Sequence, residues 1–185
     1  MHRKRIKNAR LGLKQSLAHS IYLLLVFNQL SHFCSHGPSL VSSVKLGKRH
    51  YGLQFFTRTL PCFTSLHSLF YLNGVKIIPK NIYDLLTPVA LAHLIMGDGQ
   101  SSRHGLILCT NSYSIQDVVR IMNVLMVRYK LECNIREYRS NRKVEYMIYI
   151  KHGSMPLLRT IVKAHIYPSM LYKLENKVFR GFYVV

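Results

Sequence analysis

The sequence predicts an α+β fold made of two similar halves, and three observations support this prediction. Segments with apolar residues at helical spacing are interleaved with segments in which apolar and polar residues alternate, as they do in strands. The order of these segments in the first half recurs in the second half. Hydrophobic residues make up 49% of the 185 residues, which is enough to build a folded core.

The second half opens with a helix that ends in a glycine-flanked aspartate. Thr87-Pro88 begins this helix, because proline fits a first turn, where no amide donor is required. The apolar run 89–96 continues the helix to Gly97-Asp98-Gly99. Residues 104–111 then have the pattern of a strand.

A second helix begins at Ser114, because the spacing from Ser114 to Asp117 fits a capping box. Its core face carries apolar residues at helical spacing, namely Val118, Ile121, Met122, Leu125 and Met126. The rest of the half is predicted as a hairpin of strands 132–139 and 143–151, a helix capped by Ser154, and a last short helix at 170–174 after Tyr167-Pro168. The predicted order is α-β-α-β-β-α.

The first half repeats most of this order. Its predicted elements are a strand at 11–15, an apolar helix at 17–30, strands 40–45 and 50–58 joined by a turn at Gly47-Lys48, and a helix that begins at Thr59-Leu60-Pro61. Three landmarks recur at a separation of about 96 residues, namely Leu60-Pro61 with Met155-Pro156, Gln15 with Asn111, and Lys76 with Lys173.

The repeat predicts a pseudo-duplicated chain with one half at 1–86 and the other at 87–185. The counterpart of the helix that ends at Asp98 would lie before Met1. The first half is therefore expected to be truncated.

Charge is the strongest global feature of the sequence. The chain has 26 Lys and Arg against 7 Asp and Glu, a formal net charge of +19 and a pI near 10.1. Self-repulsion on this scale indicates a polyanionic partner, and nucleic acid is the leading candidate. A ribosomal type of protein and adhesion to an anionic membrane are alternatives that charge alone does not exclude.

Other classes of protein are not expected from the composition. The longest purely apolar run, 23–27, is far shorter than the roughly 20 residues that cross a bilayer, and nothing indicates export. The four cysteines are scattered without a C-x-x-C pair, which predicts reduced thiols rather than a disulfide framework. The cluster from His32 to His36 lacks a second pair of ligands nearby, so a structural zinc site is not expected there.

Residues 91–99, LAHLIMGDG, resemble the LAGLIDADG motif of homing endonucleases. The matches are Leu91, Ala92, Leu94, Ile95, Asp98 and Gly99, and the departures are His93, Met96 and Gly97. Residues 75–79, 86–88 and 170–174 also resemble the monomeric, two-motif branch that is encoded in organellar introns. The resemblance implies αββαββα-like halves with antiparallel saddle-shaped sheets, a site-specific DNA endonuclease that acts in intron mobility, and a mitochondrial location.

Asp98 is the candidate that carries chemistry. A carboxylate at the C-terminal end of a helix faces the negative end of the helix dipole, so a nearby cation is needed to balance it. The resemblance makes Asp98 a metal ligand, with Gly97 beside it, and implies Mg²⁺ or Mn²⁺. A divalent ion held by carboxylate, water and phosphate oxygens can activate a water for phosphodiester hydrolysis. The alternative is that Asp98 only starts a turn before Gly99.

The resemblance also assigns roles to four polar residues. Lys76 and Lys173 match lysines that lie near the two scissile phosphates, and Asn111 and Gln15 match residues that order solvent near the metal. The alternative for these residues is solvated surface charge or a place in a turn.

The resemblance implies double-stranded DNA as the partner, read through the major groove by the two saddle-shaped sheets. The candidate contacts are Arg103, Arg136, Arg139, Arg142 and Lys143 in the second half, and Lys14, Lys45, Lys48, Arg49 and Arg58 in the first. Some of them are expected to contact phosphates, which position the protein without specifying sequence.

Several alternatives stay open at this stage. Cutting both strands requires two motif aspartates, and this sequence shows one. The chain could be an endonuclease, an RNA maturase that binds intron RNA with the same fold, or an inactive truncated relic. A basic protein of an organellar ribosome is a further alternative, which leaves the motif unexplained. A monomer is expected, with dimerisation through the unpaired motif helix as the other possibility.

Overall fold

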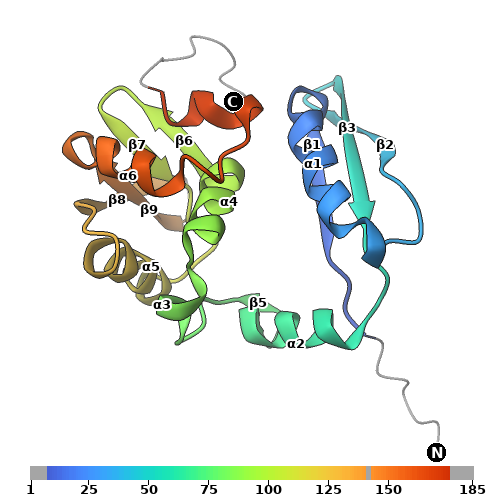
Figure 1. Ribbon diagram of the computed structural model, residues 1–185, viewed down its shortest axis with the longest axis horizontal. Coiled ribbons are helices and arrows are strands. Elements are labelled where there is room, and N and C mark those ends of the chain that lie inside the picture. Colours follow the sequence, from blue (N-terminus) through green and yellow to red (C-terminus); the bar gives the residue numbers. More distant parts are fainter. Residues whose placement is uncertain (1–7, 141–142, 176–185) are drawn as a thin grey trace, which may run out of the picture. The chain divides into compact units, whose positions relative to one another are not determined.

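The computed structural model describes residues 8–140 and 143–175. The chain divides into two compact units, residues 1–71 and residues 72–185, and each has its own sheet and helices (Figure 1). The chain passes from one to the other through the short strands β4 (Tyr71–Leu72) and β5 (Val75–Lys76). The turn between them places Asn73 and Gly74 at positive φ, 50° and 78°.

The first unit is a three-stranded antiparallel sheet with two helices. Its elements are β1 (Gly12–Ser16), the 3-10 turn η1 (Leu17–His19), α1 (Ser20–Leu30), η2 (Ser31–Phe33), β2 (Ser39–Lys45), β3 (Lys48–Phe56) and α2 (Pro61–Phe70). The strand order is β1-β3-β2. Leu23 and Phe55 are fully buried between α1 and the sheet, and the rings of Phe27 and Phe55 meet edge to face at 5.4 Å.

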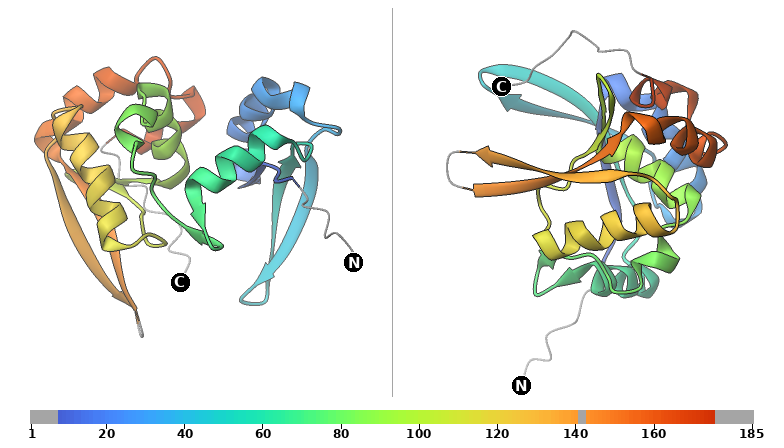
Figure 2. Two further views of the ribbon diagram at one scale, coloured as in Figure 1. Left: turned by 90° about the horizontal axis from the view of Figure 1, so that it is seen from below. Right: turned by 90° about the vertical axis from the view of Figure 1, so that its left-hand side faces the viewer.

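The second unit is a four-stranded antiparallel sheet with helices packed on it. Its elements are β5, α3 (Ile82–Leu85), α4 (Pro88–Asp98), β6 (Gly99–Ser102), β7 (Gly105–Leu108), α5 (Ile115–Val127), β8 (Cys133–Ser140), β9 (Lys143–Lys151), η3 (His152–Ser154), α6 (Met155–Val162) and η4 (Pro168–Lys173). The strand order is β6-β7-β9-β8. Figure 2 shows α5 lying along the β8–β9 hairpin.

The duplication expected from the sequence is present in both connectivity and sheet order. The series β1-α1-β2-β3-α2 matches β7-α5-β8-β9-α6, and the sheet order β1-β3-β2 matches β7-β9-β8. Among residues 8–71, the described part of the first unit, nothing corresponds to α4 and β6. The second unit itself has the order αββαββα that the resemblance implied.

Residues 72–86, which were expected in the first half, pack within the second unit. α3 lies against α5, and the Tyr129 hydroxyl donates a hydrogen bond of 2.5 Å to the Leu86 carbonyl. A repeat boundary and a packing boundary need not coincide. The repeat boundary at 86/87 therefore stays a prediction.

Two of the predicted helix starts, at Thr87 and Ser114, are confirmed. The Thr87 hydroxyl accepts a hydrogen bond from the amide of Ala90, and the Ser114 hydroxyl accepts one from the amide of Asp117. The hairpin of residues 132–151 is also confirmed, as β8 and β9. These elements were predictable because their signals are local.

Five details of the predicted elements were wrong. The strand expected at 104–111 is the shorter β7, and β6 before it was missed because GQSS has no apolar alternation. Met126 is 43% exposed, and Val124 takes its place in the core. Ser154 does not cap α6, because its hydroxyl accepts from the amide of Glu132 instead. The β2–β3 turn is at Leu46-Gly47, both at positive φ.

Each sheet has a face covered by helices and an outward face. In the first unit α1 packs on β1 and β3 over Phe55. Since neighbouring residues of a strand point to opposite faces, Phe56 and its partner on β1, Gly12, lie on the outward face. In the second unit the fully buried Ile148 and Ile150 lie under the helices, so Tyr149 lies outward. Among the described residues, no helix is both long enough and apolar enough to cross a membrane.

Candidate metal centre and nucleic-acid interface

The carboxylate of Asp98 is exposed at the last residue of α4. The chain turns directly into β6 at Gly99, whose amide donates to the Ile95 carbonyl. Gly99 has ordinary extended backbone angles, and a Cβ there would overlap the Ile95 carbonyl oxygen. Glycine is therefore required by the close approach of the helix end. The amide of Cys109, just after β7, donates to the Asp98 carbonyl at 2.9 Å and ties the helix end to the sheet.

Lys173 holds the same helix end from the other side. Its side chain is buried, and its Nζ donates to the carbonyls of Met96 at 2.6 Å and Gly97 at 3.3 Å. These carbonyls belong to the last turn of α4, where no intrahelical amide is available to pair with them. The ammonium thus supplies a cation at the negative end of the helix dipole. The dipole alone does not require a metal ion at Asp98.

Asp98, Cys109 and Lys173 influence one another electrostatically. Burial lowers the pKa of Lys173, and the charges of Asp98 and Cys109 oppose this shift. Burial raises the pKa of the Cys109 thiol, the Asp98 charge raises it further and the Lys173 charge lowers it. Cys109 was not predicted from the sequence, where nothing distinguishes it from the other scattered cysteines.

Asn111 lies beyond the end of β7 and is bound to the neighbouring strand. Its Nδ2 donates to Glu145 Oε2 at 2.6 Å, and the preceding Thr110 hydroxyl donates to the Tyr146 carbonyl at 2.6 Å. The buried Oδ1 of Asn111 has no hydrogen-bond partner among the described residues. A free amide oxygen in this position can accept a hydrogen bond from an ordered water.

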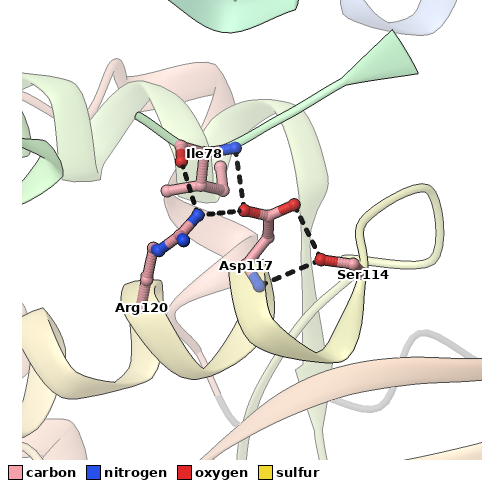
Figure 3. A network of polar contacts seen from close by, with 4 residues as sticks. All are labelled: Ile78, Ser114, Asp117 and Arg120. Atoms are coloured by element: carbon pink, nitrogen blue, oxygen red, sulfur yellow. Dashed lines mark hydrogen bonds and ion pairs between the residues drawn. The ribbon is translucent and has the colours of Figure 1, made fainter. Parts of the chain in front are cut away.

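Lys76 lies in a second group of residues at the start of α5. Its Nζ is 4.8 Å from the centre of the Tyr113 ring. Two residues further along the chain, the amide of Ile78 donates to Asp117 Oδ1 at 3.2 Å, and Arg120 donates to both Asp117 at 2.7 Å and the Ile78 carbonyl at 3.1 Å (Figure 3). Asp117 also accepts from the Ser114 hydroxyl at 2.8 Å. This buried carboxylate, predicted only as part of a capping box, fastens the segment that carries Lys76.

The predicted catalytic residues thus fall into separate groups. Asp98, Gly97 and Lys173 meet at the end of α4, while Lys76 lies against Tyr113. Gln15 is half-buried in β1 of the first unit, opposite Leu53 of β3. Within the residues that the structure describes, no three His, Cys, Asp or Glu side chains gather to hold a metal ion.

Cations predicted to contact DNA in the first unit divide by sheet face. The strand pairing places Lys14, Lys45 and Lys48 on the outward face and Arg49 on the other face, next to the β2–β3 turn. All four are exposed. Arg58 instead donates to the carbonyls of His32 at 2.9 Å and Phe33 at 3.3 Å, so it braces the chain after α1.

The second unit shows a similar division. Arg136 is on the outward face of β8, Arg103 is exposed in the β6–β7 turn, and Arg139 is on the other face with its guanidinium 3.9 Å from Glu137. Lys143 is the first residue of β9. Arg142 lies outside the described residues.

Comparisons with known proteins agree with this architecture. The model of the LAGLIDADG DNA endonuclease family matches residues 1–158. The cytochrome b mRNA maturase bI2 of Debaryomyces hansenii is 33% identical over 178 residues, which cover 94% of this chain and 67% of that protein. The intron-encoded endonuclease ai4 of Dictyostelium discoideum is 34% identical over 125 residues, 67% of this chain and 77% of that protein.

A solved structure shows the same fold. The homing endonuclease I-WcaI, solved bound to its DNA recognition sequence, matches with a TM-score of 0.84 and 24% identity over 96% of this chain and 80% of that one. The chain spans only 43% of the length of the bI2 maturase of Saccharomyces cerevisiae. Together with the glycine-flanked aspartate at the end of α4, these matches show that the chain belongs to the LAGLIDADG DNA endonuclease family.

Proposed function

We propose that this chain is a site-specific endonuclease that hydrolyses phosphodiester bonds of double-stranded DNA with a divalent metal ion, in a mitochondrial intron-mobility system. One observation carries the proposal. The Asp98 carboxylate is exposed at the end of a helix that Lys173, Cys109 and Gly99 hold in place. A carboxylate with a fixed backbone and an exposed side chain suits a metal ligand, because the bound ion must also contact a DNA phosphate.

The oxygen donors at this helix end fit Mg²⁺ or Mn²⁺. Asp98 would hold the ion through its carboxylate, and Gly97 through the lone pair of its carbonyl that does not accept from Lys173, with water and DNA phosphate completing the shell. When bound, such an ion supplies a water of lowered pKa and stabilises charge on the leaving oxygen. No soft ligand is needed for this chemistry.

The other residues position solvent and balance charge. The unpaired amide oxygen of Asn111 would orient a water near the helix end. The buried ammonium of Lys173, which donates to two carbonyls of α4, would balance the charge of a phosphate bound at this helix end. We propose that Gln15 orders solvent as Asn111 does, that Lys76 balances phosphate charge as Lys173 does, and that the outward Lys14, Lys45 and Lys48 contact phosphates.

A cleavage assay tests this function. The full chain is incubated with Mg²⁺ and a duplex carrying the intronless junction of the host gene, and strand breaks are mapped. We expect nicking or cutting at one site, with Asp98→Asn at least about 100-fold slower and the matched control Asp84→Asn, an exposed acid of α3, unchanged. Cleavage by Asp98→Asn at the wild-type rate would reject the assigned role.

Maturation of intron RNA is the second candidate, and the identity with two bI2 maturases favours it. Under this alternative the same basic surfaces bind folded intron RNA, and Asp98 is dispensable. The distinguishing result is intron splicing promoted equally by the wild type and Asp98→Asn, with no cleavage of DNA by either. We propose a monomer, which sedimentation of the purified chain would test.

A further inference from the structure

One arginine on the outward face of each sheet lies over an aromatic ring. The guanidinium carbon of Arg10 is 4.1 Å from the centre of the Phe56 ring, and that of Arg136 is 3.6 Å from the centre of the Tyr149 ring. Phe56 ends β3 and Tyr149 lies in β9, the central strands of the two sheets. Arg10 has no recognisable signal in the sequence, because its ring partner is distant along the chain.

Each ring lies against a glycine of the neighbouring strand. A Cβ on Gly12 of β1 would come within 2.6 Å of Phe56 Cε1. A Cβ on Gly105 of β7 would come within 2.9 Å of Tyr149 Cε2. The same Cβ on Gly105 would come still closer to the Ile150 carbonyl oxygen, at 2.2 Å, so Gly105 makes room for the neighbouring backbone as well as for the ring. The Tyr149 hydroxyl, which donates to the His104 carbonyl at 2.8 Å, fixes its ring further.

Both arginines keep their hydrogen-bonding edges available. Arg10 and Arg136 are exposed, and among the described residues neither forms an ion pair with a carboxylate. The ring beneath each guanidinium restricts its motion, so less freedom is lost when a ligand binds. The lysines of the outward face are flexible point charges, which suit phosphate.

We propose that Arg10 and Arg136 are the guanine-reading residues of the two sheets, each held ready by its glycine–aromatic stack. A planar guanidinium donates two parallel hydrogen bonds to O6 and N7 of guanine in the major groove, which an ammonium cannot reproduce. The hollow beside Arg10 is lined by polar side chains that include His36, Ser39 and Gln54, so it can receive a base edge. The inference rests on the proposed function and adds a base preference to it.

The test is selection of binding sites from a pool of randomised DNA duplexes by the full chain. The wild type is expected to enrich sites with at least one guanine position for each stack. Arg10→Lys and Phe56→Leu should weaken one guanine preference about tenfold, and Arg136→Lys and Tyr149→Leu should weaken the other. The salt dependence of binding should not change, because every variant keeps the charge.

Matched control variants distinguish loss of the stack from a general effect on folding. Phe56→Tyr and Tyr149→Phe keep the ring and should keep the preference, and Lys163→Arg changes an exposed cation after α6, outside both sheets, and should leave both preferences intact. If the wild type selects sites but the stack variants select the same guanines within twofold, the inference fails while the proposed function stands. If the wild type enriches no duplex, or enriches only RNA from a parallel pool, both fail.

Discussion

Lys173 places a buried positive charge at the carbonyl end of α4. A cation near Asp98 was expected from the helix dipole and was assigned to a metal ion, but Lys173 already occupies that end of the helix. The proposal of a metal ion therefore rests on the exposure of the Asp98 carboxylate at the end of the helix. The consequence for Lys173 is a structural role that can be measured apart from catalysis.

Lys173→Met should lower the free energy of unfolding by about 1–3 kcal/mol. The substitution leaves the Met96 and Gly97 carbonyls without their donor and removes the cation from the helix end. Urea unfolding of the full chain measures the change, with the exposed Lys163→Met as control. Equal stability of the two variants would contradict the capping role.

Gly97 and Gly99 should respond in opposite directions to alanine. A Cβ on Gly99 meets the Ile95 carbonyl, so Gly99→Ala should destabilise the fold by about 1–3 kcal/mol. A Cβ on Gly97 meets nothing within 4 Å inside a helix, so Gly97→Ala should stabilise it by about 0.5–1 kcal/mol. Thermal unfolding of the two variants measures the difference. A change of Tm in the same direction for both would contradict the close approach of Gly99 to Ile95.

At the scale of elements, Asp117 joins α5 to the segment that leads into α3. Its carboxylate accepts from Ile78, Arg120 and Ser114, so one buried side chain fixes both a helix start and a connector (Figure 3). Since Lys76 lies two residues before Ile78, the network restricts the position of the Lys76 backbone and so the space that its ammonium can occupy. The contact with Tyr113 limits the lysine further.

Asp117→Ala should cost about 2–4 kcal/mol of stability, more than the roughly 1 kcal/mol expected for Ser114→Ala. The larger change leaves the Ile78 amide and the Arg120 guanidinium without their shared acceptor. Asp84→Ala, an exposed acid of α3, is the control and should stay within about 0.5 kcal/mol of the wild type. Denaturant unfolding measures the three variants. An Asp117→Ala midpoint as high as that of Ser114→Ala or Asp84→Ala would argue against the network.

The elements that could be predicted are those with local signals. Thr87 and Ser114 predict helix starts, and the alternation of apolar and polar residues in 143–151 predicts a strand. β6 could not be found, because its pairing with β7 is set by Gly99 and by the helix end before it. The hydrogen bond from Ile78 to Asp117 spans 39 residues, and no spacing rule reaches that far.

At the scale of the whole molecule, the net charge of +19 favours a polyanionic partner. The outward face of the first unit's sheet carries three exposed lysines, Lys14, Lys45 and Lys48. Of the candidate site, the motif predicts Asp98, and the resemblance predicts Lys173 and Asn111, whose roles remain proposals. Cys109, Tyr113 and Arg10 could not, because their relevance depends on neighbours that only folding brings near.

Lys48→Gln should weaken DNA binding at all sequences alike. Removing one phosphate contact should reduce the slope of log K against log salt by about one, without changing base preference. Glu137→Gln removes one of the few acids and should strengthen binding slightly. Binding titrations on one duplex at several salt concentrations measure both, and an unchanged slope for Lys48→Gln would exclude its contact with phosphate.

We propose that a divalent ion binds the carboxylate at the end of α4, and the other roles proposed for this helix end depend on that ion. The most direct measurement is the anomalous scattering of manganese in crystals of the full chain with bound duplex. We predict a peak at the Asp98 oxygens that disappears in Asp98→Asn. A well-ordered DNA complex in which manganese binds elsewhere and the Asp98 oxygens bind only water would contradict the account.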